Sequence, residues 1–321
     1  MKRAKYIAFS LLISFCFVTI ILQMAESKLS NFWGKTCYKL SGHSFMEVDT
    51  KDKSGMPMRY YPKLGKVYDP HLIGSEASRF YDTRIEPERQ KAFLEMSSWL
   101  IMQIDSTGFI PQNYSYKAVN LSKPWYSAST QSICLLAIAK RAGHLRDPEA
   151  FQKSRRILNQ LDELGSTIPE GGIWFWEFGE GVYSLKGMLR TLIGLSSYQK
   201  LVGDSLSAQL FKQGTVALAA KLPQLSKTGY LDDKYHYKNP RSEHQELVNL
   251  LALVNEATPD SIFKPVIIKL KRADNRFVLL QMLSRPRFGR IMGFLIPWGL
   301  VTWFVFFLLK PKKSGTTEHG N

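Results

Sequence analysis

Cysteine is scarce in this 321-residue chain, which has three cysteines and no Cys-x-x-Cys pair. Its six histidines are scattered, and no cysteine or histidine group has the spacing of a metal site. Zinc-finger spacings and RNP-like aromatic strands, which are typical of nucleic-acid binding, are also missing from the sequence. The sequence therefore indicates no metal, no redox cofactor and no nucleic-acid partner.

The three cysteines lie in different surroundings. Cys16 falls in an apolar segment, and Cys134 falls in an apolar helix-like run, where a cysteine is usually a small buried hydrophobe. Cys37 lies in an irregular N-terminal segment. A Cys37–Cys134 disulfide could form in an oxidising compartment, but the sequence does not establish it.

Acidic residues are outnumbered, because 43 lysines and arginines face 27 aspartates and glutamates, which gives a net charge of +16. Between Lys264 and Arg290 the only acid is Asp274. Basic residues also occupy both ends of the chain: Lys2, Arg3, Lys5, Lys310, Lys312 and Lys313. Such an excess predicts an acidic partner, either anionic lipid or an acidic polysaccharide.

Two uncharged apolar segments, at 6–25 and 291–309, predict membrane helices at both ends of the chain. We expect residues 1–25 to be an uncleaved signal anchor, with a cleaved signal peptide as the alternative. The basic residues beyond each segment place both tails, including 310–321, in the cytoplasm. Residues 26–290 would then be periplasmic, extracellular or lumenal.

The residues between these segments divide into a stem and a helical domain. Residues 26–66 are irregular and predict a stem or a short hairpin, whereas residues 67–284 show helical periodicity. Tyr68, Tyr126 and Tyr183 each open the first helix of a pair, 58 and 57 residues apart. The expected helices are 68–81, 86–104, 126–142, 147–164, 183 to the Gly203-Asp204 cap, 205–222, 242–256 and 260–274.

In each pair the first helix is the more apolar and the second the more charged. A helical hairpin cannot bury its inner face alone, so stacked copies build one core. We therefore predict an all-α fold, an incomplete α/α toroid of about four hairpins, with the long inter-pair loops on one binding face. The alternative is an α-solenoid that binds protein.

The loop before the third hairpin concentrates aromatic residues around one acid, Glu177. Rigid aromatic rings beside a carboxylate suit the floor of a sugar-binding site, although a buried aromatic loop that packs a helix end is the alternative. The four aromatic residues are Trp174, Phe175, Trp176 and Phe178.

Several motifs follow one another in the order found in a known family. They are Gly65-Lys-Val-Tyr-Asp-Pro, Pro124-Trp-Tyr-Ser-Ala-Ser-Thr-Gln, Trp-Phe-Trp-Glu-Phe, Leu185-Lys-Gly-Met-Leu-Arg-Thr-Leu-Ile-Gly-Leu, Thr228-Gly-Tyr and Glu243-His-Gln-Glu-Leu-Val-Asn-Leu-Leu. With them the chain resembles, over roughly residues 60–270, the C-terminal domain of D-glucuronyl C5-epimerases. The resemblance implies an α/α toroid and a glycan-uronate substrate.

The chain departs from the family pattern at three places. Phe178 stands where members carry a tyrosine, no arginine follows the Thr228-Gly-Tyr turn, and Pro240 falls where a later tyrosine is expected. These differences favour an alternative in which the protein binds glycan without catalysis.

C5 epimerisation needs a base, an acid on the opposite face of the sugar, and cations that neutralise the substrate carboxylate. The catalytic candidates are Tyr230, Tyr235, Tyr237 and Glu177. Arg190 is either paired in the core or directed at an acidic ligand, and a neutral hydrogen-bonding role suits His244 at a helix start. The substrate-binding candidates are Trp125, Tyr126, Trp174, Trp176, Tyr183, Arg190, His236, Arg241 and His244.

Together these features predict a membrane-anchored uronyl C5-epimerase-like protein, an isomerase if active, that acts on an acidic polysaccharide. A homodimer is compatible with the sequence. Two alternatives stay open: a uronate polysaccharide lyase, which shares the proton abstraction, and a non-catalytic glycan-binding or scaffold subunit of polysaccharide biosynthesis.

Overall fold

The computed structural model describes residues 7–21, 48–61, 64–116, 120–179, 181–227, 231, 240–258, 262–274 and 288–309. The chain divides into two compact units. One contains Asn31–Asp274, and the other combines Met1–Ser30 with Asn275–Asn321.

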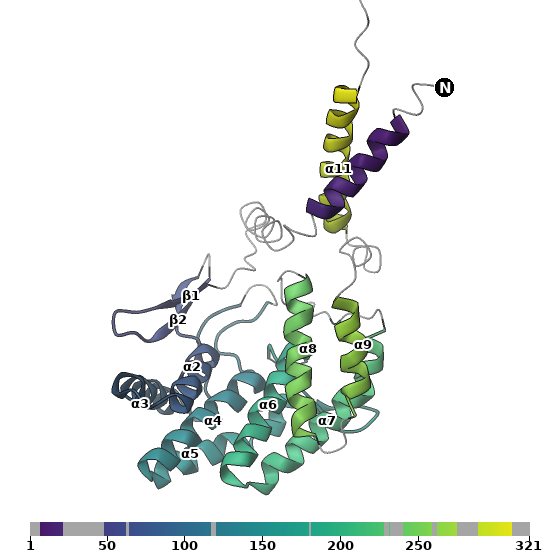
Figure 1. Ribbon diagram of the computed structural model, residues 1–321. Helices are drawn as coiled ribbons and strands as arrows, with labels where there is room; N and C mark the ends of the chain where they lie inside the picture. The colour runs from purple at the N-terminus through teal and green to yellow at the C-terminus, as the bar shows by residue number, and fades with distance from the viewer. Residues whose placement is uncertain are drawn as a thin grey trace, which may run out of the picture. The chain divides into compact units, whose positions relative to one another are not determined.

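The larger unit is built from the four helical hairpins that the sequence predicts (Figure 1). Within each hairpin the two helices pack together, and the first helices pack in the row α2–α4–α6–α8. The helices are α2 (Pro70–Asp82), α3 (Pro87–Met102), α4 (Ala128–Leu145), α5 (Pro148–Asn159), α6 (Leu185–Val202), α7 (Ser205–Leu225), α8 (Pro240–Ala257) and α9 (Lys264–Asp274).

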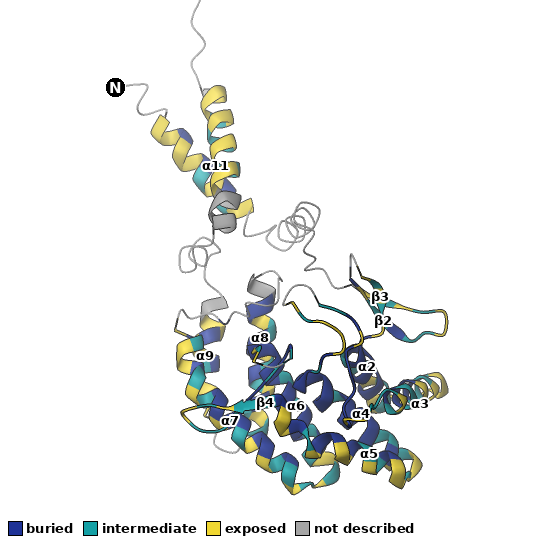
Figure 2. Ribbon diagram, turned by 180° about the vertical axis from the view of Figure 1, so that it is seen from behind, coloured by how far each residue is buried: buried dark blue, intermediate teal, exposed yellow. Residues whose placement is uncertain are grey.

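The first helix of a hairpin is buried and the second is more exposed, as Figure 2 shows for α4 and α5. Helix α4 buries 12 of its 18 residues, whereas α5 buries 4 of 12. Close packing of α4 on α6 depends on Gly194, because a Cβ there would lie 2.6 Å from Ser132 Oγ. The predicted inner row of apolar helices is confirmed.

Short polar residues fix where these helices begin and end. The Asp69 carboxylate accepts hydrogen bonds from the His71 and Leu72 backbone N–H groups at the start of α2, and Pro70 occupies the first turn. Gly203, at φ 75°, ends α6 in the left-handed region, and Asp204 caps α7 at once. The predicted Gly203-Asp204 boundary is confirmed.

The described chain is mostly helical, as expected, but two small antiparallel sheets accompany the helices. Strands β1 (Val48–Lys51), β2 (Pro57–Tyr61) and β3 (Gly65–Val67) form one sheet, with Arg59 opposite Val67. Strands β4 (Gly165–Thr167) and β5 (Ile173–Phe175) form the second, after the 3-10 turn η2 (Leu161–Leu164). Helical periodicity does not report such short strands, because each holds only three to five residues.

The smaller unit pairs the helix of residues 7–21 with α11 (Phe288–Leu309). The Ser14 and Thr302 hydroxyl oxygens lie 2.6 Å apart, and the Phe15 and Trp298 ring centroids lie 6.1 Å apart. The membrane spans expected at 6–25 and 291–309 are not found: in the described part of the chain, no helix combines the length and the apolar character needed to cross a membrane. The location of residues 26–290 outside the cytoplasm stays a prediction.

Cys134 is a free thiol that is buried against α2, where its Sγ donates to the Pro70 carbonyl oxygen at 3.3 Å. Cys16 is also free. Cys37 lies outside the described residues. The Cys134 thiol therefore has the role of a small buried hydrophobe, and the structure gives no support to a Cys37–Cys134 disulfide.

Candidate active site

The first turns of the inner helices lie close together, and the aromatic loop brings Glu177 to them. Ser129, in the first turn of α4, donates its hydroxyl hydrogen to Glu177 Oε2 at 2.7 Å. Gly187, in the first turn of α6, lies against the same carboxylate, where an added Cβ would overlap with Oε2. Glu177 therefore occupies the junction between the N-terminal ends of α4 and α6.

Backbone hydrogen bonds hold the Glu177 loop in this position. The Trp176 N–H donates to the Leu164 carbonyl oxygen at 2.8 Å, and the Trp176 carbonyl oxygen accepts from the Ala128 N–H at 3.0 Å. The Glu177 N–H donates to the Val182 carbonyl oxygen at 3.0 Å. With its neighbours fixed, the Glu177 side chain is directed inward and is only 7% exposed.

Two cations on α6 meet one acid on α8. Lys186 Nζ forms an ion pair with Glu246 Oε1, and Arg190 Nη2 lies 3.3 Å from the same oxygen. The Lys186 side chain is 3% exposed, so its charge depends on pairing inside the protein. Arg190 remains half-buried, with part of its surface open to solvent. Of the two roles predicted for Arg190, the structure shows the ion pair.

A third cation approaches from the sheet. Arg59, on β2, binds the Asp69 carboxylate at 2.8 Å and lies 3.5 Å from Asp49. Asp69 is 1% exposed and also caps α2, so one carboxylate fixes both a helix start and an arginine. This pair connects the first sheet to the N-terminal end of α2.

His71, which the sequence motifs do not single out, completes the group. Its Nδ1 is buried and has no hydrogen-bond partner among the residues that the structure describes. Burial lowers the pKa of His71 well below 6.5, and the positive charges of Arg190, Arg59 and Lys186 lower it further, against a hydrogen bond with the Ser129 backbone. His71 therefore stays neutral at neutral pH, and Ser129 contacts both His71 and Glu177. The sequence feature that could have predicted this role of His71 is its position directly after the Gly65–Pro70 motif.

The lowered pKa of His71 predicts an acid-sensitive stability. The unfolded chain binds this proton near the ordinary imidazole value of 6.5, and the folded protein binds it only at lower pH. The contribution of His71 to the free energy of unfolding is therefore fully present above about pH 6.5. It falls as the pH decreases below that value, by up to about 1.4 kcal/mol per pH unit. Urea unfolding should show a smaller loss for His71→Gln than for the parent between about pH 7.5 and about pH 5.5. Equal losses in both proteins would contradict the assignment.

Trp125 and Phe178 belong to a second, aromatic core with Tyr61 and Tyr114. Trp125 is 6% exposed and its Nε1 donates to the Tyr114 carbonyl oxygen at 2.8 Å. The Phe178 ring packs against Trp125 at 6.0 Å and against Tyr116 at 5.5 Å. Both residues are engaged in packing, and Trp125 presents little surface to a sugar.

The other predicted aromatic contacts differ in exposure. Trp174 is buried, whereas Trp176 is half-buried and its Nε1 donates to Ser166 Oγ at 3.1 Å. The Tyr126 hydroxyl donates to Asp105 Oδ2 at 2.6 Å. Tyr183 is exposed at the residue before the Ser184 cap of α6. Trp176, Tyr126 and Tyr183 therefore keep surface that a ligand can reach.

His244 is completely buried and has a structural role. Its Nδ1 accepts a hydrogen bond from the Leu231 N–H at 2.9 Å, and its Nε2 lies 3.2 Å from the Leu270 carbonyl oxygen. This geometry requires a proton on Nε2 and none on Nδ1, which is the neutral form that the helix start predicts. His244 joins the segment after α7 to α9.

The remaining candidates cannot be placed. Tyr230, Tyr235, His236 and Tyr237 lie outside the described residues, as does the side chain of Arg241. Their roles in proton transfer and substrate binding stay predictions. Among the residues that are described, no cluster of three or more histidine, cysteine or acidic side chains is arranged to hold a metal.

The arrangement combines a buried carboxylate, a neutral imidazole and paired cations at helix N-termini. A helix N-terminus carries about half a positive charge and favours anions. Glu177 can accept hydrogen bonds from a sugar or tyrosine hydroxyl, and Arg190 is the cation with surface open to solvent. The site is therefore suited to hold a sugar that carries a negative charge.

Comparison with known proteins gives one family match. The model described as "D-glucuronyl C5-epimerase C-terminus" matches residues 104–272, a span that includes Ser129, Glu177, Lys186, Arg190 and Glu246. No curated protein matches the chain.

Several solved structures show weak similarity. A polysaccharide lyase has a TM-score of 0.44 at 14% identity, covering 81% of this chain and 75% of its own. A GH76 α-mannanase from Bacteroides thetaiotaomicron has a TM-score of 0.45 at 14% identity, covering 80% and 71%. An unsaturated glucuronyl hydrolase specific for heparin has a TM-score of 0.41 at 10% identity, covering 82% and 83%.

Proposed function

Since the chain belongs to the family described as the D-glucuronyl C5-epimerase C-terminus, we propose that it acts on an acidic polysaccharide by removing and returning the C5 proton of a glucuronate residue. The observation that carries the proposal is the position of Glu177. It is a buried carboxylate, bound to Ser129 at the junction of α4 and α6, within the span that the family model matches.

Each part of the site has a distinct role in this proposal. Glu177 orients the sugar or a tyrosine by accepting a hydroxyl hydrogen bond, and His71 supports it through Ser129. Arg190 and the helix N-termini bind the uronate carboxylate, which carries increasing negative charge when C5 loses its proton. Tyr230, Tyr235 and Tyr237 stay the predicted proton-transfer groups. One group takes the C5 proton and another returns a proton to the opposite face, so the net proton count does not change.

One observation favours a non-catalytic alternative. Phe178 stands at the position where a tyrosine was expected, and its ring is buried between Trp125 and Tyr116. It offers no hydroxyl to a substrate. A protein that has kept the glycan site but lost this group would act as a glycan-binding subunit of polysaccharide biosynthesis.

Exchange of hydrogen at C5 tests these alternatives directly. Incubation of the full chain with uronic-acid polymers in heavy water should place deuterium at C5, without new ultraviolet absorbance. The proton removed from C5 enters the solvent and a deuteron replaces it. An unsaturated product would identify a lyase, because elimination of the 4-linked sugar leaves a double bond. Binding of a uronan without any hydrogen exchange at C5 would contradict both the epimerase and the lyase hypotheses. It would support the hypothesis of a glycan-binding subunit.

A further inference from the structure

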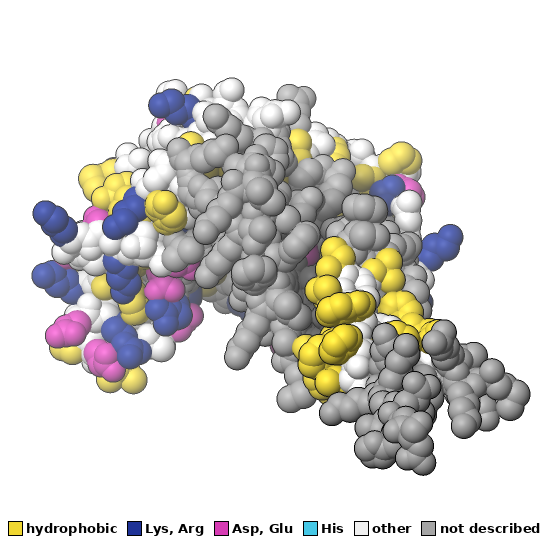
Figure 3. All heavy atoms as spheres, turned by 90° about the horizontal axis from the view of Figure 1, so that it is seen from above, with side chains coloured by type: hydrophobic (Ala, Val, Ile, Leu, Met, Phe, Trp, Pro, Cys, Tyr) yellow, Lys and Arg dark blue, Asp and Glu magenta, His cyan; other side chains and the backbone are white. Residues whose placement is uncertain are grey.

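The smaller unit has an apolar exterior. On the helix of residues 7–21, Phe9, Leu12 and Phe17 are 55%, 61% and 54% exposed. On α11, Trp303, Phe304 and Phe307 are 68%, 56% and 66% exposed. Most of the described part of both helices is coloured as exposed in Figure 2, and hydrophobic side chains gather there in Figure 3. Water-soluble proteins rarely expose continuous apolar surface over two whole helices.

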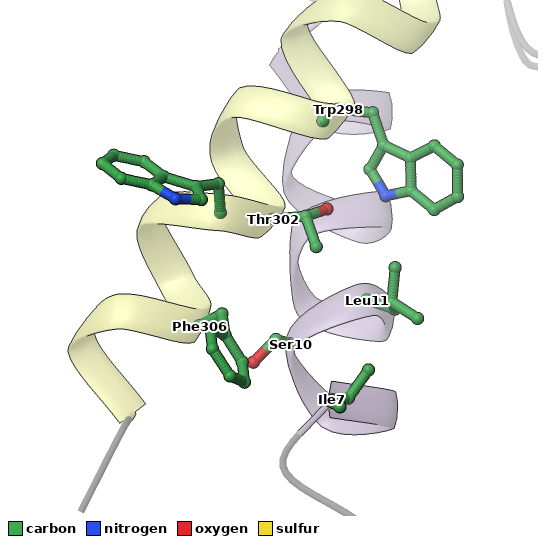
Figure 4. A pocket seen from close by; sticks show the side chains of 8 residues that line it. Ile7, Ser10, Leu11, Trp298, Thr302 and Phe306 are labelled. Atoms are coloured by element: carbon green, nitrogen blue, oxygen red, sulfur yellow. The ribbon is translucent and has the colours of Figure 1, made fainter. Parts of the chain in front are cut away.

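Two serines of the same unit face inward. Ser10 and Ser14 are both fully buried. The Ser14 hydroxyl donates to the Leu11 carbonyl oxygen at 3.1 Å and lies 2.6 Å from the Thr302 hydroxyl of α11. Figure 4 shows Ser10 and Thr302 directed into the space between the two helices. Apolar residues outside and hydrogen-bonded hydroxyl groups inside are the reverse of a water-soluble helix pair, and are typical of helices in lipid.

A groove between the helices is also apolar. It has a volume of about 410 Å³, and Ile7 and Leu11 on one side face Trp298 and Phe306 on the other. Ile7 and Phe306 lie at the same end of the pair in Figure 4, so the helices are antiparallel. Hydrocarbon is the chemical group that such walls accommodate without loss of hydrogen bonds.

The basic residues that flank the two helices in the sequence indicate which kind of partner covers the apolar exterior of the pair. Lys2, Arg3 and Lys5 precede the first helix, and Lys310, Lys312 and Lys313 follow α11. Because the helices are antiparallel, the start of the first helix and the end of α11, next to which these residues stand in the sequence, lie at the same end of the pair. Six basic residues beside an apolar surface attract anionic lipid headgroups and repel a second copy of the same end.

We propose that the two-helix unit buries its apolar exterior in part of the depth of a lipid bilayer that contains anionic headgroups, which does not require either helix to cross the bilayer. The Ser14–Thr302 contact holds the two helices together where the surroundings offer no water. The proposal is independent of the polysaccharide chemistry of the larger unit.

Flotation of the full chain with vesicles tests this proposal. We expect the protein to float with phosphatidylcholine vesicles that contain phosphatidylglycerol, and to float less with phosphatidylcholine alone. Phe304→Glu together with Phe307→Glu should lower the vesicle-bound fraction by about tenfold or more, because a carboxylate is poorly tolerated among acyl chains. Both side chains are more than half exposed. Because Phe304 also lines a groove with Ile13 and Phe17, the fold of the double variant is checked separately.

A matched control separates lipid insertion from general adhesion. Ile85→Glu removes an exposed apolar side chain in the larger unit, where it is 96% exposed, and should leave flotation unchanged. Circular dichroism of the double variant should match the parent. Failure of the parent to float with either vesicle, equal flotation of the double variant, or discrete self-association in place of vesicle binding would overturn the proposal.

Discussion

Replacement of Glu177 by glutamine should reduce C5 hydrogen exchange by about 100-fold or more, while the protein remains folded. Glutamine has the shape of glutamate, so its amide oxygen can still accept the Ser129 hydroxyl, which lies 2.7 Å from Oε2 in the parent. The negative charge that orients a sugar or tyrosine hydroxyl is lost. We expect the free energy of unfolding to change by less than about 1 kcal/mol, because the hydrogen bond is kept.

Two measurements make this prediction specific. Deuterium incorporation at C5 gives the activity, and urea unfolding gives the stability of each variant. Glu95→Gln, which changes an exposed carboxylate on α3, should leave both quantities unchanged. If Glu177→Gln exchanges hydrogen as fast as the parent, Glu177 has only a structural role. If the parent shows no exchange, the assay cannot place Glu177 in catalysis, and glycan binding becomes the property to compare.

The helical hairpins could be predicted because their signals are local. The start of α2 at Pro70, behind the Asp69 cap, and the Gly203-Asp204 junction depend on a few consecutive residues whose backbone preferences are strong. The spacing of Tyr68, Tyr126 and Tyr183 reflects the repeat itself. The short strands β1 to β5 depend on partners elsewhere in the chain, and so the helical pattern did not reveal them.

The candidate site was predicted only in part, because its contacts join distant residues. The aromatic neighbours and the motif order identified Glu177. Arg190 was selected for its place beside an apolar stripe, but its partner Glu246 is 56 residues away. His71 carries no motif of its own, and its place in the site depends on Ser129, Lys186 and Arg190, which lie on other helices. Trp125, by contrast, lies in a motif that predicted a sugar contact, but its ring packs in the aromatic core.

Replacement of Gly187 by alanine should both destabilise the larger unit and reduce its activity. An added Cβ would overlap with Glu177 Oε2, and would lie 2.6 Å from its Cδ and 2.8 Å from its Cβ. Because Glu177 is fixed by backbone bonds on either side, its carboxylate must leave Ser129. Overpacking and a broken buried hydrogen bond together should cost about 3 kcal/mol. The melting temperature should fall by roughly 6–12 °C, since 1 kcal/mol corresponds to 2–4 °C in a domain of this size.

Gly143→Ala is the matched control, because Gly143 lies exposed in α4 with nothing within 4 Å of an added Cβ. Alanine there should raise the stability by about 0.5–1 kcal/mol, since it removes only backbone freedom from the unfolded chain. A second comparison identifies the cause of the Gly187→Ala effect. In a Glu177→Ala background the carboxylate is gone, so Gly187→Ala should cost at least about 1 kcal/mol less than in the parent. An equal cost in both backgrounds would show that the strain lies in α6 itself, and that Gly187 does not hold Glu177 in place.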